Sequence, residues 1–207
     1  VLLTDQSSDT DVHTLDDGAD APQVLILPTL QSNPIHVYWA TPEALDTDGF
    51  LNDQATSASA ITTASTILDN PDVPRTVSVL PGGTTADVPA GDVTVNGTDI
   101  HGNTISDTVT FLANATEAKN TTKAFKTVTS VVFPIQDGAG ATYDVGWTDN
   151  LGLPFCMKTS AVVRAALNGV LESTAATATA ATTTEKSVVD LNSALNGTAV
   201  DVWIDRG

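Results

Sequence analysis

Short apolar segments that alternate with small polar residues run through residues 75–133 and return at 143–147. Within them, apolar side chains occupy mostly odd positions and small polar side chains mostly even ones. Successive side chains of a β-strand point to opposite faces, so this period of two places one face in a core and the other in water. Turn residues separate the segments at intervals of roughly 8 to 12 residues. The pattern predicts an all-β fold, either an antiparallel sandwich or a jelly-roll-like barrel.

Turn signals between the apolar segments define the elements that we expect. His101, Gly102 and Asn103 should join two strands as a hairpin, and a short helix should start at Thr41 with Pro42 in its first position. Residues 161–172 fit either an apolar helical stripe or a hairpin at residues 168–169, and we favour strands. The expected strands are 22–28, 35–39, 76–79, 93–100, 104–112, 125–134, 143–147, 188–191 and 198–204.

Composition along the chain predicts four regions. The first, residues 1–21, is polar and rich in Asp, which is typical of an extended arm that a partner would order. A proline-rich turn at 70–74 separates the next two regions. We therefore expect an acidic arm (1–21), N-terminal strands with connecting loops (22–70), a central β-sandwich module (71–155), and C-terminal strands (156–207) that complete the sheet or form a small second β lobe.

The chain carries a net charge of −17, from 25 acidic residues against 8 Lys and Arg, and 21 of the acidic residues are Asp. Binding to nucleic acid depends on Lys and Arg that neutralise phosphates, so we expect no nucleic-acid partner. Anionic membranes are disfavoured for the same reason, and no apolar run approaches the roughly 20 residues of a membrane span. The Asp excess indicates loops, and fits either a saline habitat or solubility at high copy number.

Residues that carry chemistry are sparse. No nucleophile stands with a base and no His or Cys cluster occurs, so we predict a protein that is not an enzyme and has no cofactor. Cys156 is the single cysteine, which excludes an internal disulfide and indicates a buried structural thiol. The weak metal candidates are Asp46, Asp48 and Asp53, a fragment of a Ca²⁺ loop that would hold a structural divalent cation. The EF-hand pattern fails there, and an ordinary Asx turn is favoured.

Two apolar runs are candidate partner-binding surfaces. The first, bounded by prolines, is an expected edge or inter-subunit strand: Val24, Leu25, Ile26 and Leu27. The second follows the strand at 143–147, and core packing is its alternative role: Leu151, Leu153, Pro154 and Phe155. In a chain with so few aromatic residues, Trp39, Trp147 and Trp203 are expected to anchor the core.

Five phrases of the sequence resemble structural proteins of tailed viruses. They are DVPRTV (72–77), GDVTVNGTDIHGNTI (91–105), KAFKTVTSV (123–131), LGLP (151–154) and DLNSALNGTAVDV (190–202). The resemblance spans about residues 70–204 and is to virion components of siphovirus-like phages, particularly head decoration proteins.

What the resemblance implies is a virion protein on the outer surface of a capsid. Its partners would be the major capsid protein and further copies of itself, with a trimer favoured, and the N-terminal arm would clasp a neighbour. The main alternative is a host-surface adhesin or receptor-binding module on a vertex or tail. A carbohydrate-active enzyme is the third, and it needs two carboxylates facing each other across a cleft.

Overall fold

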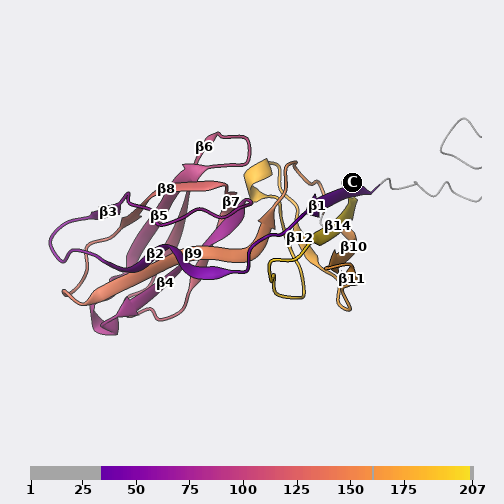
Figure 1. Ribbon diagram of the computed structural model, residues 1–207. Coiled ribbons are helices and arrows are strands. Elements are labelled where there is room, and N and C mark those ends of the chain that lie inside the picture. The colour runs from indigo at the N-terminus through magenta and orange to yellow at the C-terminus, as the bar shows by residue number, and fades with distance from the viewer. Residues whose placement is uncertain (1–33, 160, 206–207) are drawn as a thin grey trace, which may run out of the picture. The chain divides into compact units, whose positions relative to one another are not determined.

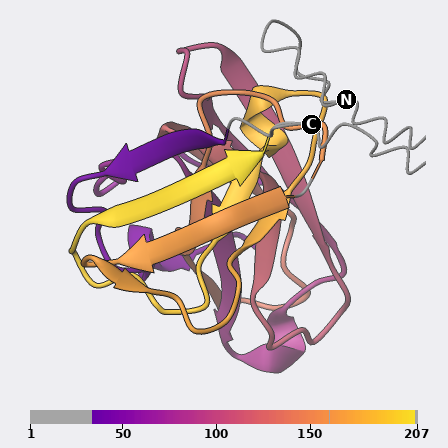
Figure 2. The same ribbon diagram turned by 90° about the vertical axis from the view of Figure 1, so that its right-hand side faces the viewer.

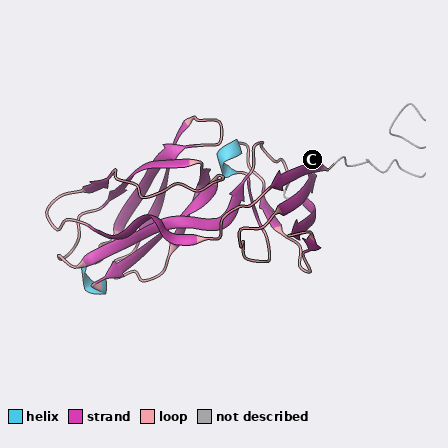
Figure 3. Ribbon diagram, viewed as in Figure 1, coloured by secondary structure: helices cyan, strands magenta, loops and turns pink. Residues whose placement is uncertain are grey.

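Strands dominate the computed structural model, which describes residues 34–159 and 161–205 (Figures 1 and 3). The only helices there are two 3₁₀ turns, η1 (Thr85–Asp87) and η2 (Thr184–Lys186). Every strand pairing is antiparallel, so the all-β prediction is confirmed. The arm expected at 1–21 and the strand expected at 22–28 lie outside the described residues.

The strands form three sheets. The central sheet has the order β12-β13-β9-β4-β7, and β2 also pairs with β9; the covering sheet is β3-β8-β5-β6; the terminal sheet is β1-β14-β10-β11. The central strands are β2 (Asp46–Ala55), β4 (Arg75–Gly83), β7 (Lys119–Phe125), β9 (Ala141–Gly152), β12 (Thr177–Thr179) and β13 (Val188–Asp190). The covering strands are β3 (Thr62–Ala64), β5 (Gly91–Thr98), β6 (Thr104–Phe111) and β8 (Thr127–Phe133). The terminal strands are β1 (Ile35–Trp39), β10 (Ala161–Leu167), β11 (Val170–Leu171) and β14 (Val200–Asp205).

A first core lies between the central and covering sheets. The alternation read from the sequence places Val93, Val95 and Gly97 of β5 inward, and the intervening polar residues face outward. Phe50, Phe133 and other buried side chains from β2 to β9 complete this core. Each fully buried Val or Phe contributes about 1.5–3 kcal/mol. We call strands β2 to β8, with most of β9, the large lobe.

Side chains close the large lobe where β6 and β7 face each other, at the edges of two different sheets. The Asp107 carboxylate accepts hydrogen bonds from the backbone N–H groups of Thr122 (2.7 Å) and Lys123 (3.0 Å), and from the Thr122 hydroxyl (2.9 Å). In return, Lys123 Nζ donates to the carbonyl of Ser106 at 2.8 Å, and Lys119 Nζ donates to that of Thr110. The backbone groups of this edge are thereby partly covered, which protects it from pairing with another chain.

A second core lies under the terminal sheet. Val200, Val202 and Ile204 of β14 pack with Leu151, at the end of β9, and with Val189 of β13. We call this part, β1 and β10 to β14 with the end of β9, the small lobe; Figure 2 turns its terminal sheet toward the viewer. β9 therefore contributes to both cores.

The small lobe is built from segments far apart in the sequence. β1 pairs with β14 along its whole length, from Ile35 opposite Ile204 to Trp39 opposite Val200. The terminal sheet thus combines strands from the C-terminal part of the chain with β1, the strand expected at 35–39. The sequence carries no local signal of this pairing.

Two local turn predictions are confirmed, and one helix prediction is wrong. The hairpin at 101–103 is confirmed between β5 and β6. Strands are also confirmed for 161–172, where Asn168 (φ 51°) and Gly169 (φ 74°) form the turn between β10 and β11. The helix at Thr41 is wrong, since the chain runs there without helix into β2.

The reason for the missing helix lies in tertiary hydrogen bonds. The carbonyl of Glu43 accepts a hydrogen bond from the Arg75 guanidinium at 2.5 Å, and the carbonyl of Ala44 accepts one from the Trp147 indole at 3.0 Å. These partners satisfy carbonyls that a helix would have used internally, and they hold the segment against β4 and β9.

Candidate functional site

The three predicted metal candidates do not come together. All of them lie on β2, where the Asp46 carboxylate accepts a hydrogen bond from the N–H of Asp48 (3.1 Å), as in an Asx turn. Asp48 accepts a hydrogen bond from the side chain of Asn52, and the Asp53 N–H donates to Asp144 at 2.7 Å. Within residues 34–159 and 161–205, no group of three His, Cys, Asp or Glu side chains is placed to hold a metal ion.

The glycine after these aspartates has a packing role. A Cβ atom built on Gly49 would stand 2.3 Å from the ring of Trp147, so only glycine leaves room for the indole. The Asp-Thr-Asp-Gly motif therefore serves the large-lobe core and a local turn.

The predicted partner surface at 151–155 divides into buried and accessible residues. Leu151 and Leu153 are 0% and 1% exposed and belong to the small-lobe core, so they are not available to a partner. Their burial follows from the pairing of β9 with β13, which places the end of β9 beneath the terminal sheet. Pro154 is exposed, and Phe155 is half-buried against the same core. The other predicted surface, from Val24 to Leu27, lies outside the described residues.

The predictions for tryptophan and cysteine have mixed outcomes. Trp39 and Trp147 are buried, as predicted. The prediction for Trp203 is wrong, because alternation along β14 turns Val202 and Ile204 inward and leaves Trp203 on the outer face. Cys156 is half-buried, with its Sγ 3.5 Å from the Thr184 hydroxyl and from a backbone carbonyl.

Trp203 belongs to a cluster on the outer face of the terminal sheet. Its ring stacks on that of His36, from β1, with centroids 4.5 Å apart, and the Arg164 guanidinium of β10 lies 4.7 Å from the ring centroid. His36 Nε2 also lies 2.7 Å from the Asp201 carboxylate. Tyr38 is the next outward residue of β1 and is 57% exposed. We call these five residues the aromatic face.

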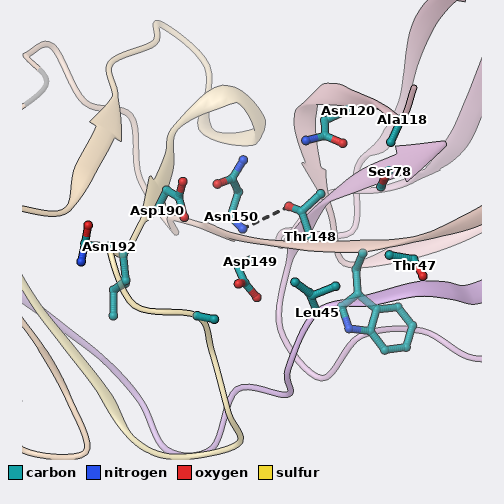
Figure 4. Close-up of a pocket in the computed structure, with 13 residues that line it drawn as sticks. Leu45, Thr47, Ser78, Ala118, Asn120, Thr148, Asp149, Asn150, Asp190 and Asn192 are labelled. Atoms are coloured by element: carbon teal, nitrogen blue, oxygen red, sulfur yellow. Dashed lines mark hydrogen bonds between the residues drawn. The ribbon is translucent and has the colours of Figure 1, made fainter. Parts of the chain in front are cut away.

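A pocket of about 530 Å³ lies where β2, β4, β7 and β9 meet the segment that follows β13 (Figure 4). Two carboxylates, of Asp149 and Asp190, and three side-chain amides enter its lining, together with apolar side chains. The lining residues are Leu45, Thr47, Ser78, Ala118, Asn120, Trp147, Thr148, Asp149, Asn150, Asp190, Leu191, Asn192 and Ala194.

A bulge in β9 places Asp149 in the pocket. Arg75 of β4 pairs with Leu151 and Val77 pairs with Trp147, so β9 has two more residues than β4 between these points. The hydroxyl of Thr148, within the bulge, accepts a hydrogen bond from the N–H of Asn150 at 3.1 Å. Bulges re-aim side chains that a regular strand would direct elsewhere. The sequence alone gives no sign of this register shift.

Behind the bulge lies a fully buried arginine. Arg75 is 0% exposed; its guanidinium donates to the carbonyls of Thr148 (2.8 Å) and Glu43 (2.5 Å) and lies 3.8 Å from Asp72. Burial lowers the pKa of Arg75, while the nearby charges of Asp72, Asp149 and Glu43 oppose that shift. This arginine ties the start of β4 to β9 and to the segment before β2.

The two pocket carboxylates are poorly neutralised. Burial raises the pKa of Asp149. A hydrogen bond from the backbone of Leu195, the Arg75 charge and a hydrogen bond from the backbone of Leu45 each lower that pKa in part. Burial, and then the charge of Asp149, raise the pKa of Asp190. Asp149 Oδ1 is buried and accepts no hydrogen bond from the described residues. The pocket can therefore receive a cation or a hydrogen-bond donor.

Comparisons with protein-family models, curated proteins and solved structures give no match for this chain. Among the described residues there is no helix with the length and apolar character needed to cross a membrane. A function for the protein therefore has to be proposed from its own residues and their geometry.

Proposed function

We propose that this protein is a non-enzymatic structural component of a tailed-virus particle that binds the outer surface of the capsid and stabilises it. The observation that carries this proposal is the distribution of exposed apolar side chains. Of the nine large apolar residues exposed in the described chain, four lie on strands of the terminal sheet: Tyr38, Val163, Val170 and Leu171. The strand register places Tyr38 and Leu171 on the same face of this sheet, and apolar residues exposed on one face are typical of a contact site.

The five phrases that resemble virion proteins support the same role. They fall on both lobes and include the β5–β6 hairpin, the end of β9 and the residues from β13 to β14. A net charge of −17 is compatible with a position outside the capsid, where the shell separates the protein from the packaged DNA. Copies that bind the assembled lattice in preference to free subunits would stabilise it by mass action.

The proposal is tested by locating and counting the protein in purified virions. We expect many copies on the head, as a regular outer layer, and earlier rupture on heating of particles that lack the protein. A few copies only, or a position confined to the tail, would contradict a capsid decoration role. Sedimentation of the purified chain would test the trimer that we favour.

The proposed contact surface is tested by a matched pair of substitutions. Leu171→Asp places a charge on the terminal sheet, and Leu112→Asp places one at another exposed leucine that follows β6. We expect Leu171→Asp to weaken binding to particles that lack the protein, and Leu112→Asp to leave it unchanged. Equal effects of both substitutions on binding would contradict the assignment of the terminal sheet as the contact surface.

The aromatic face favours one alternative, a receptor-binding or adhesin module on a vertex or tail. An exposed Tyr38 and a half-buried Trp203 beside charged groups suit recognition of a cell-surface ligand. Binding of the purified protein to host cells, lost on Tyr38→Ser, would support this alternative. Location on the head with no host-cell binding would reject it.

A further inference from the structure

The Asp149 pocket has a lining divided between apolar and acidic groups. Leu45 and the mostly buried Leu191 and Trp147 supply apolar surface, and Asp149 and Asp190 supply carboxylates. Its volume of about 530 Å³ is large enough for an extended side chain and far larger than a single water needs. A ligand that fits such a lining has an aliphatic part and a cationic or donor-rich end.

Some polar atoms of the pocket make no hydrogen bond within the described chain, although backbone hydrogen bonds from Leu195 and Leu45 do reach the Asp149 carboxylate. Asp149 Oδ1 is buried without a hydrogen bond from the described chain. Within that same part of the chain, the side-chain amides of Asn120, Asn150 and Asn192 make no hydrogen bond either. An unsatisfied buried carboxylate oxygen costs free energy, and a donor from outside would remove that cost.

The buried arginine does not fill this need. The Arg75 guanidinium donates to two backbone carbonyls, of Thr148 and Glu43, and its closest acidic partner is Asp72. Arg75 thus weakens the negative field of Asp149 without forming an ion pair with it. A metal ion is a poor fit, because only two carboxylates enter a pocket much larger than an ion.

We propose that this pocket accepts a lysine or arginine side chain from a partner protein. The aliphatic stem packs against Leu45 and Leu191, and the charged end reaches Asp149 and Asp190. Long basic side chains combine these two properties, and a charge-assisted hydrogen bond to a carboxylate is about twice as strong as a neutral one. The inference rests on the proposed function, since it specifies a basic residue on the capsid surface.

Proton binding should compete with the basic ligand. Burial raises the pKa of both pocket carboxylates, and the charge of Asp149 adds to the rise at Asp190. A cation in the pocket stabilises the ionised forms and lowers both pKa values, by linkage. Affinity should therefore fall as the pH is lowered through the range where these carboxyls gain protons.

The experiment measures binding of blocked amino acids to the full-length purified chain by NMR titration and calorimetry. The probes are Nα-acetyl-lysine methylamide and its arginine counterpart. Norleucine and Nε-acetyl-lysine derivatives serve as uncharged controls of similar length. We expect the two basic probes to bind and to shift the Trp147 indole resonance, with affinity that decreases as salt is added. The neutral probes should bind at least about tenfold more weakly, because they lack the charge-assisted bond.

Substitutions localise the effect. Asp190→Asn, at the exposed rim, and Asp149→Asn, in the bulge, should each weaken binding of the lysine probe about tenfold. Asp92→Asn is the matched control: Asp92 lies on β5 outside the pocket and accepts a hydrogen bond from Thr110, which asparagine can also accept. If Asp149→Asn fails to fold, Asp190→Asn with an unchanged unfolding temperature still decides the question.

Three results would overturn the proposal: equal binding of lysine and norleucine probes, an equal loss in Asp92→Asn, or tighter binding of a neutral glycan than of either basic probe. Failure here is distinguishable from failure of the proposed function. If the protein is found on the capsid but does not bind the basic probes, only the pocket assignment is rejected. If it binds the probes but is absent from heads, the capsid role is rejected.

Discussion

Both lobes bury an apolar core between strands, but they differ in whether those strands are close together or far apart in the sequence. The large lobe takes its strands from the continuous stretch 46–152 and closes the edges of β6 and β7 with its own side chains. The small lobe combines residues 35–39 and the end of β9 with residues from 161 onward, and leaves apolar side chains exposed on β10 and β11. The difference indicates a self-sufficient scaffold that carries a second, more accessible surface.

Loss of Arg75 should free the start of β4 from β9 and from the segment before β2, and should have the largest effect on stability. Arg75→Ala leaves two carbonyls without donors and Asp149 and Asp72 without a neighbouring cation. We expect a loss of roughly 3–5 kcal/mol in the free energy of unfolding, as for removal of one partner from a buried charge pair. Chemical denaturation measures it. Arg164→Ala, on the aromatic face, is the control and should cost no more than about 1 kcal/mol.

Truncation of Leu151 should weaken the small lobe selectively. Leu151 is fully buried in the small-lobe core, so Leu151→Ala should cost about 2–5 kcal/mol. Hydrogen exchange should then accelerate in β13 and β14 more than in β5. A loss below about 0.5 kcal/mol, as is usual for surface substitutions, would show that Leu151 is a surface residue and not part of the core.

Removal of the Asp107 carboxylate should open the large lobe at its covered edge. Asp107→Ala deletes the acceptor of three hydrogen bonds from Thr122 and Lys123. We expect a loss of about 1.5–3 kcal/mol, the range for hydrogen bonds to charged groups. Faster amide exchange at residues 122 and 123 would localise it. Unchanged exchange there would show that the edge stays closed without Asp107.

Acid should act with opposite signs on Asp99, in the large lobe, and on the two carboxylates of the pocket. Asp99 is 5% exposed, and burial alone would raise its pKa, but hydrogen bonds from Asn103 and from the N–H of His101 lower it overall. Its contribution to stability is therefore complete above the unfolded-state pKa of about 3.9, and is lost as the pH falls through the lower folded-state value.

Asp149 and Asp190 behave in the opposite way, because their folded-state pKa is raised. Folding is favoured while they are protonated, and that advantage disappears as the pH rises through the raised values. Asp99→Asn should flatten the acid limb of a stability–pH curve, whereas Asp190→Asn should remove a decline in stability that accompanies rising pH just above the ordinary Asp pKa. Equal changes in both variants would contradict the assigned signs.

The smallest effect is expected on the exposed strand of the small lobe. Val170→Asp should change the free energy of unfolding by no more than about 0.5 kcal/mol, because the side chain is 70% exposed. A thermal melt measures this. A large loss would mean that β11 packs more tightly than its exposure indicates.

The sequence predicts local features of this fold well, because alternation and turn chemistry act over a few residues. The hairpin at 101–103 and the turn at Asn168 and Gly169 follow from such signals. Pairing over long distances leaves no local trace, so the partnership of β1 with β14 could not be predicted. The same holds for the outward position of Trp203, which depends on the phase of its strand and not on its residue type.

The candidate pocket was harder still to predict. Asp149 looks like any other loop aspartate in a chain with 21 of them. Its role depends on a bulge opposite β4 and on the buried position of Arg75, and both arise from tertiary pairing. The sequence holds one trace of the arginine's position, because residue 75 has the same odd phase as Val77 and Val79, which the alternation places inward.

The pairing of β1 with β14 also orders events in time. His36 meets Asp201 across 165 residues, so this contact cannot form on the ribosome until nearly all of the described chain has been made. By then every strand of the large lobe has long been available for folding. The exposed terminal sheet is thus completed after the strands of the large lobe have been made, and a nascent chain cannot present this contact site before its scaffold has been synthesised.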